Sequence, residues 1–80
     1  INMSEVTLNL LDENKRGRIK QIRGKGKLRK RFFEMGLVPG TEVEVIKRAP
    51  LGDPIELKIK GYNIAFRKNE AQYVVVEPIQ

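Results

Sequence analysis

The second half of the chain alternates apolar and polar residues with a period of two, and this pattern constrains the fold more than any other feature. After Gly40, "TEVEVIKR" places Val43 and Val45 on one side of an extended segment and two glutamates on the other. "IELKIK", "YNIAFR" and "YVVVEP" follow the same rule. Such alternation is typical of strands that bury only one face. It predicts a β-fold of short strands.

Turn signals separate these strands. "APLGDP" combines two prolines with a glycine, and Gly61 marks a tight corner. Before them, "RGRIKQI" indicates a first strand, in which Ile19 and Ile22 are three residues apart and so favour a bulge. The side chains that alternation directs inward in the later strands are Ile55, Leu57, Ile59, Tyr62, Ile64, Phe66, Val74 and Val76.

One segment changes to a helical period. Leu28, Phe32 and Met35 are spaced i, i+4 and i+7, and Gly36 follows as a residue suited to end a helix. A helix is predicted over residues 27–36. Residues 1–14 form a lead-in segment that is expected to pack one or two leucines onto the body before the polar "DENK" turn.

Five short strands and one inserted helix predict an all-β fold, a small SH3-like or OB-like barrel. Closure would protect the edges that an open five-stranded sheet exposes. Eighty residues are enough for a single domain, 1–80. No apolar run approaches the roughly 18–20 residues that span a bilayer, and the first residues do not resemble a signal peptide. We therefore expect a cytoplasmic location.

The chain contains neither histidine nor cysteine. Nucleophilic triads, imidazole bases and the usual zinc or copper sites are thereby excluded. Glu42 and Glu44, about 7 Å apart on one strand face, could form at most a weak site for a hard cation. "RGKGK" lacks the spacing and the hydroxyl of a phosphate-binding loop. The sequence therefore predicts no catalytic residue, no cofactor and no metal site.

Positive charge is concentrated in one segment. Residues 15–31 hold ten basic and no acidic side chains, whereas the rest of the chain has a net charge of −4. Such a field attracts an acidic partner. A membrane is disfavoured because the helix is short and its apolar face is needed by the barrel. Nucleic acid, an acidic protein and plain solvation remain open, although only Phe33 and Tyr73 are expected to be exposed for base stacking.

Phe33 favours a protein partner. It lies about 140° around the helix from Leu28, outside the barrel-facing stripe and among Arg29, Lys30 and Glu34. A large apolar side chain surrounded by charges is typical of the centre of a protein interface. The alternative is that a leucine of the lead-in segment, Leu8 or Leu11, covers it.

Between residues 28 and 77 a basic helix that ends in Met-Gly-Leu is followed by a series of turns at characteristic spacings. The segments are Met35-Gly36-Leu37, Pro39-Gly40-Thr41, Ala49 to Pro54, Gly61-Tyr62, Arg67-Lys68 and Glu70-Ala71. With this combination the chain resembles the ferrous iron transport protein A family (FeoA). Phe32-Phe33 stands where the family more often has two leucines, and the basic run is heavier than usual.

The resemblance implies a free-standing SH3-like domain, a small accessory protein of ferrous iron uptake. It would bind and modulate the membrane GTPase FeoB at its cytoplasmic portion, with Fe(II) as the cargo of the pathway rather than a bound ligand. The alternatives are nucleic-acid binding by residues 15–31, weak transition-metal binding, and weak self-association through strand edges. The predicted partner-binding residues are Arg29, Lys30, Phe33 and Glu34, with Leu51 and Asp53 in the "APLGDP" turn, where Leu51 would lie at the tip or fold back onto the barrel.

Overall fold

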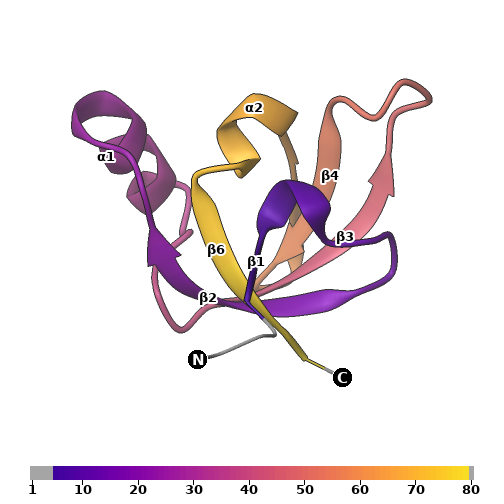
Figure 1. The fold of residues 1–80 in the computed structure, drawn as a ribbon, viewed down its shortest axis with the longest axis horizontal. Coiled ribbons are helices and arrows are strands. Elements are labelled where there is room, and N and C mark those ends of the chain that lie inside the picture. The colour runs from indigo at the N-terminus through magenta and orange to yellow at the C-terminus, as the bar shows by residue number, and fades with distance from the viewer. Residues whose placement is uncertain (1–4, 80) are drawn as a thin grey trace.

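A computed structural model describes residues 5–79. Its strands form one antiparallel sheet in the order β1-β6-β2-β3-β4-β5, strongly curled around a single core (Figure 1). The strands are β1 (Val6–Thr7), β2 (Arg16–Ile22), β3 (Glu42–Arg48), β4 (Ile55–Ile59), β5 (Tyr62–Phe66) and β6 (Val74–Ile79). The helices are a 3-10 turn η1 (Leu8–Leu10), α1 (Gly26–Glu34) and α2 (Lys68–Ala71).

The lead-in segment contributes an additional strand. The sequence predicted about five strands, but β1 pairs with β6 through Val6 and Val76 and through Thr7 and Val75. A two-residue strand is too short to display alternation, so the pattern could not reveal it. The prediction that this segment packs leucines onto the body is confirmed, because Leu8 and Leu11 belong to the core.

The expected bulge is confirmed. The register between β2 and β6 shifts between Ile19 and Gln21, and Ile19 and Ile22 are both buried. The extra residue lets both isoleucines face the core despite their spacing. A second shift, between Val45 and Lys47, occurs where β3 pairs with β4.

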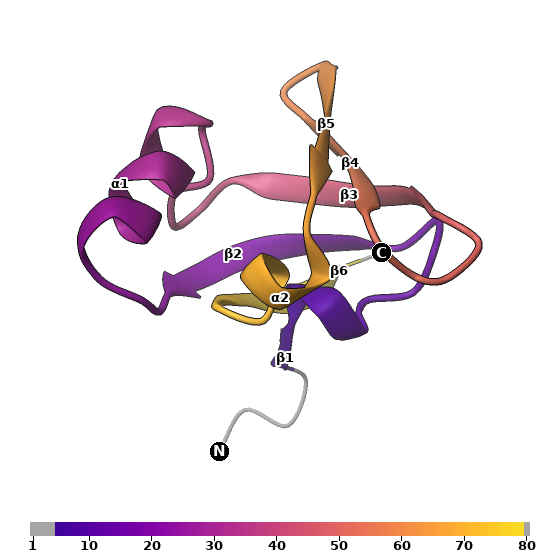
Figure 2. The same ribbon diagram turned by 90° about the horizontal axis from the view of Figure 1, so that it is seen from above.

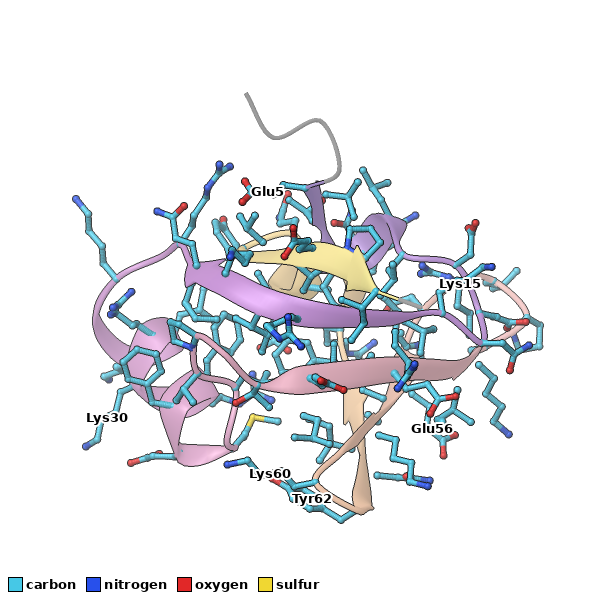
Figure 3. All side chains as sticks on the ribbon, turned by 90° about the horizontal axis from the view of Figure 1, so that it is seen from below. Glu5, Lys15, Lys30, Glu56, Lys60 and Tyr62 are labelled. Atoms are coloured by element: carbon cyan, nitrogen blue, oxygen red, sulfur yellow. The ribbon has the colours of Figure 1, made fainter. Side chains whose placement is uncertain are left out.

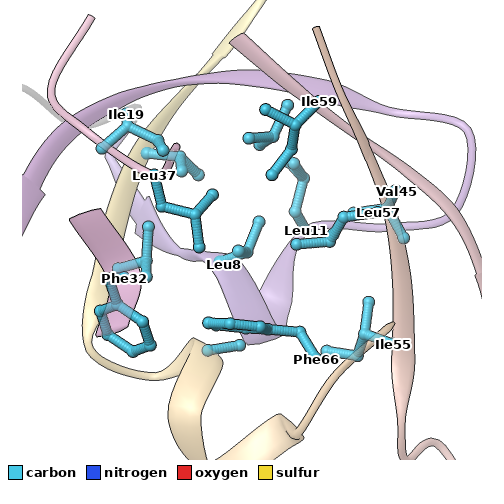
Figure 4. Packing of buried hydrophobic residues seen from close by; sticks show 14 of the residues in the cluster. Leu8, Leu11, Ile19, Phe32, Leu37, Val45, Ile55, Leu57, Ile59 and Phe66 are labelled. Atoms are coloured by element: carbon cyan, nitrogen blue, oxygen red, sulfur yellow. The ribbon is translucent and has the colours of Figure 1, made fainter. Parts of the chain in front are cut away.

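The helix was predicted almost at its observed position. It begins one residue earlier and ends two residues sooner than expected, at Glu34. Gly36 adopts a φ of 90°, which is the left-handed conformation that ends helices at little cost for glycine. Phe32 docks the helix on the barrel, with its ring centroid 5.1 Å from that of Phe66 (Figure 4).

Among the side chains of β4 and β5 that were predicted to face inward, only Tyr62 is exposed, so that prediction is wrong. Ile55, Leu57, Ile59 and Phe66 are buried and Ile64 is partly buried, but Tyr62 is 45% exposed. It is the first residue of β5, opposite Ile59, and its hydroxyl donates a hydrogen bond of 2.6 Å to the carbonyl of Met35 (Tyr62 is labelled in Figure 3). The ring therefore fastens the end of α1 to the β4–β5 hairpin.

Replacing Tyr62 by phenylalanine removes only this hydroxyl. We expect the free energy of unfolding to fall by about 1 kcal/mol, the usual net value of such a bond. Urea unfolding followed by circular dichroism measures the change. Tyr73→Phe is the matched control, since no hydrogen bond of the Tyr73 hydroxyl is found among the described residues; an equal loss in both variants would contradict the assignment.

Within residues 5–79, no helix has the length and apolar character that crossing a membrane would require.

Candidate functional site

The outward face of α1 carries Phe33, whose side chain is 38% exposed. Leu8 and Leu11 do not cover it, because both are buried in the core. Instead, the guanidinium of Arg29 lies 4.7 Å from the centre of the Phe33 ring. Arg29 also donates a hydrogen bond of 2.8 Å to the carbonyl of Ile22, at the end of β2. Phe33 is thus presented to solvent with a fixed cation on one side.

Two further predicted residues lie beside Phe33. The Lys30 ammonium is 3.9 Å from the Glu34 carboxylate, one helical turn away, and both side chains are largely exposed (Figure 3 labels Lys30). Arg29, Lys30, Phe33 and Glu34, together with Gly26, line one shallow hollow on the surface of α1. The structure therefore brings the four helix residues of the predicted contact together.

Leu51 and Asp53 lie elsewhere. They belong to the loop between β3 and β4, which is on the opposite side of the molecule from α1 in both views (Figures 1 and 2). Leu51 is 95% exposed at the loop and does not fold back onto the barrel. The four helix residues and the two loop residues therefore lie in two separate regions of the molecule.

Asp53 has contacts within the chain. Its Oδ1 accepts a hydrogen bond of 2.9 Å from the backbone N–H of Lys68, and its Oδ2 is 3.9 Å from Arg67. An acidic oxygen on the first N–H of a helix satisfies a donor that has no partner inside the helix. Asp53 therefore ties the β3–β4 loop to α2, which positions Leu51.

The basic segment does not form a continuous unpaired surface. Arg16 and Arg18 both approach Glu42, at 3.9 Å and 3.1 Å. Lys20 lies 3.9 Å from Glu77, which comes from the far end of the chain. Several of the ten cations are therefore partly balanced by carboxylates that the linear sequence places far away.

One contact between two helices was missed by sequence reasoning. Arg31 of α1 forms an ion pair and hydrogen bond with Glu70 of α2, and its guanidinium lies 6.0 Å from the centre of the Phe66 ring. The other oxygen of Glu70 is buried without a hydrogen-bond partner among the described residues. No local signal relates residues 39 positions apart, so only the fold could reveal this pair.

Metal ligands do not gather at any point of the described chain. Within residues 5–79, no three histidine, cysteine, aspartate or glutamate side chains are placed to hold one ion. Glu42, half of the weak cation site considered from the sequence, is paired with arginines instead.

Comparison with known proteins relates this geometry to a family. The model of the FeoA domain matches residues 6–78. A fusion protein of Fe(2+) transport protein A and the Fe(2+) transporter FeoB, from Porphyromonas gingivalis, is 41% identical over 61 residues, which is 76% of this chain and 7% of the relative. The chain thus corresponds to a small fraction of the length of that curated relative.

Two solved structures share the fold. The NMR structure of a FeoA-like protein from Clostridium acetobutylicum superposes with a TM-score of 0.89 and 33% identity, over 98% of this chain and 91% of that chain. The zinc complex of FeoA from Stenotrophomonas maltophilia, described as a prokaryotic SH3-domain protein, has a TM-score of 0.80 and 26% identity, over 90% and 89%. The predicted SH3-like class is confirmed. Because the family model matches nearly the whole chain, the chain belongs to the FeoA family, which is associated with ferrous iron transport.

Proposed function

We propose that this chain binds and modulates a FeoB-type membrane GTPase through a protein–protein contact centred on Phe33, and that it performs no catalysis of its own. The exposed Phe33 ring, set among Arg29, Lys30 and Glu34, is the observation that carries the proposal. A few residues near the centre of a protein interface carry most of its binding energy, and aromatic and arginine side chains are frequent among them. The partner surface would offer an apolar pocket bordered by carboxylates.

The choice of partner is supported by the Porphyromonas gingivalis relative, whose name joins protein A and FeoB in one fusion protein. Joining two modules in one chain raises their effective concentration and favours a contact that is weak between separate proteins. In this proposal the chain acts on the cytoplasmic side of the membrane. Fe(II) is the cargo of the transporter, and this chain is not required to hold it.

The contacts of Arg29 hold its guanidinium beside the Phe33 ring before any partner binds. The guanidinium is already held by Ile22 and by the ring, so little side-chain freedom is lost when a partner covers it. Ordering a mobile side chain at an interface costs about 0.5–1.5 kcal/mol. A preorganised ring and cation avoid much of that cost.

Phe33→Ala is expected to weaken binding to the soluble GTPase portion of FeoB by roughly 10–100-fold, the range of an interface hot spot. Calorimetric titration with the isolated GTPase portion measures this change. Tyr73→Ala is the matched control, because Tyr73 is also 38% exposed but lies outside α1, just before β6. The control should bind with unchanged affinity.

A charge reversal tests the rim of the same contact. Lys30→Glu should slow association and reduce its dependence on salt, because rim charges act mainly by steering. Lys15→Glu reverses an exposed charge at the other end of the molecule and should have less effect (Figure 3 labels both). Unchanged affinity in both Phe33→Ala and Lys30→Glu would contradict the proposed site, and binding without any effect on GTP hydrolysis would contradict the modulating role.

A further inference from the structure

A different part of the molecule, the outer edge of β5, is open to another strand. The strand order makes β5 one margin of the sheet, with β4 as its only partner among the described residues. The other margin, β1, is only two residues long, whereas β5 has five. Figure 2 shows the β4–β5 hairpin standing out from the rest of the sheet.

The turn before β5 determines which backbone groups face outward. Lys60 and Gly61 both have positive φ, 50° and 88°, and they separate the paired residues Ile59 and Tyr62. In such a two-residue hairpin the pair next to the turn exchanges both backbone hydrogen bonds, and bonded and non-bonded pairs then alternate.

Applied to β5, this alternation leaves two residues unbonded to β4. Asn63 is opposite Lys58, and Ala65 is opposite Glu56, at the non-bonded positions. Their N–H and C=O groups therefore point away from β4. Neither residue has another backbone partner among residues 5–79, and the Asn63 side chain is engaged by Glu56 at 3.2 Å rather than with its own backbone.

The edge lacks the usual features that prevent strand addition. Natural edge strands are normally protected by lysine, by proline or by a bulge. None of the five β5 residues is charged or a proline, and the β4–β5 register has no shift. Asn63 and Ala65 are both exposed. An added strand would meet four unsatisfied backbone groups and no obstructing charge.

Positive charge borders this edge at both ends. Lys60 precedes β5 and Lys68 follows it, and neither has a carboxylate within ion-pair distance among the described residues. The shallow cleft at the second end is lined by Ala65, Arg31, Arg67 and Glu70; its arginines already approach Glu70 and Asp53, so Lys68 is the cation left for a partner there. A second copy of this chain, paired antiparallel, would bring Lys60 against Lys68 of its partner, which like-charge repulsion disfavours.

We propose that β5 accepts an extended segment of a protein partner as an added strand, and that this segment has an uncharged centre and carboxylates at both ends. Asn63 and Ala65 form the backbone hydrogen bonds, and Lys60 and Lys68 pair with the terminal carboxylates. Strand addition of this kind draws affinity from the main chain and specificity from the side chains beside it. The site does not depend on the α1 contact, so Phe33→Ala leaves it intact.

The test uses the full chain and a synthetic probe, a short peptide with an alternating valine–threonine centre and glutamates at each end. Amide hydrogen exchange by NMR should show fast exchange of Asn63 and Ala65 in the free protein. Excess peptide should slow both by roughly tenfold or more. A peptide with lysines in place of the glutamates is the matched control and should give much weaker protection.

Two protein variants complete the test. Ala65→Pro removes an outward N–H that β4 does not use, so the fold should persist while peptide binding is lost. Reversing both Lys60 and Lys68 to glutamate should weaken binding of the acidic peptide about tenfold and make the basic peptide the preferred ligand. This second variant keeps the test decisive if Ala65→Pro does not fold.

Four results would overturn the proposal. The first is protection of the Asn63 and Ala65 amides in dilute free protein, and the second is protection that rises with protein concentration, which would mark a second copy. The third is equal binding of the acidic and basic peptides. The fourth is unchanged peptide binding by a folded Ala65→Pro variant. Because Phe33→Ala should not alter peptide binding, failure here is distinguishable from failure of the FeoB contact.

Discussion

Phe32→Ala is expected to lower the free energy of unfolding by about 3–5 kcal/mol, the usual cost of truncating a buried phenylalanine. Phe32 is fully buried, and its ring lies 5.1 Å from the centre of the Phe66 ring. It is the only fully buried residue of α1, so its loss leaves a cavity where the helix docks on the barrel. Since small domains have a total stability of about 5–15 kcal/mol, the variant should lose a large part of it.

The neighbouring residue provides the control. Phe33→Ala removes a side chain of the same size that is 38% exposed and contacts Arg29, so its cost should be about 1 kcal/mol. Urea unfolding of both variants measures the difference. Similar losses would mean that α1 is not oriented as described, whereas a stable Phe33→Ala also ensures that its effect on partner binding is not caused by unfolding.

The orientation of α1 was predictable because a helix has a fixed period. Leu28, Phe32 and Met35 face the barrel as the spacing indicated, and Phe33 faces outward. The position of the Arg29 guanidinium, held beside the Phe33 ring by a hydrogen bond, was not predictable in the same way. Its acceptor is the carbonyl of Ile22, and that carbonyl is brought beside α1 only when β2 and the helix have taken their places.

Alternation predicts the side of a strand but not the depth of each side chain. Phe66, Ile64 and Tyr62 share one face of β5, yet their burial decreases in that order. Tyr62 lies opposite the buried Ile59 but next to the turn, and its hydroxyl bonds the carbonyl of Met35 at the surface. The inward prediction therefore succeeded for Phe66 and failed for Tyr62.

Long-range pairing limits what a charge pattern can say about a site. The basic segment appeared unbalanced in the sequence, but Glu42, Glu70 and Glu77 approach it from other elements. The sequence also gave no distance between the helix residues and Leu51, whose loop lies on the other side of the molecule from α1. Whether either region binds a partner stays a prediction.

The secondary structure of the lead-in segment, β1 and η1, also could not be predicted from its sequence. Two residues of β1 cannot display a period, and the turn η1 depends on contacts with distant residues. Arg48 of β3 donates hydrogen bonds to the carbonyls of Asn9 and Leu11, and its own backbone N–H is bound by Glu13. Residues 6–13 of this segment are therefore held by the barrel at several points and form an integral part of it.

Leu8→Ala tests this conclusion directly. Leu8 is fully buried in η1, so the variant should lose about 2–5 kcal/mol of unfolding free energy, as for other leucines in closed cores. Leu10→Ala is the matched control within the same turn, because Leu10 is 65% exposed and its truncation should cost less than about 0.5 kcal/mol. Thermal and urea unfolding measure both. A lead-in segment that merely rests on the surface would give two small and similar losses, whereas a segment that completes the core makes Leu8→Ala nearly as damaging as the loss of Phe32.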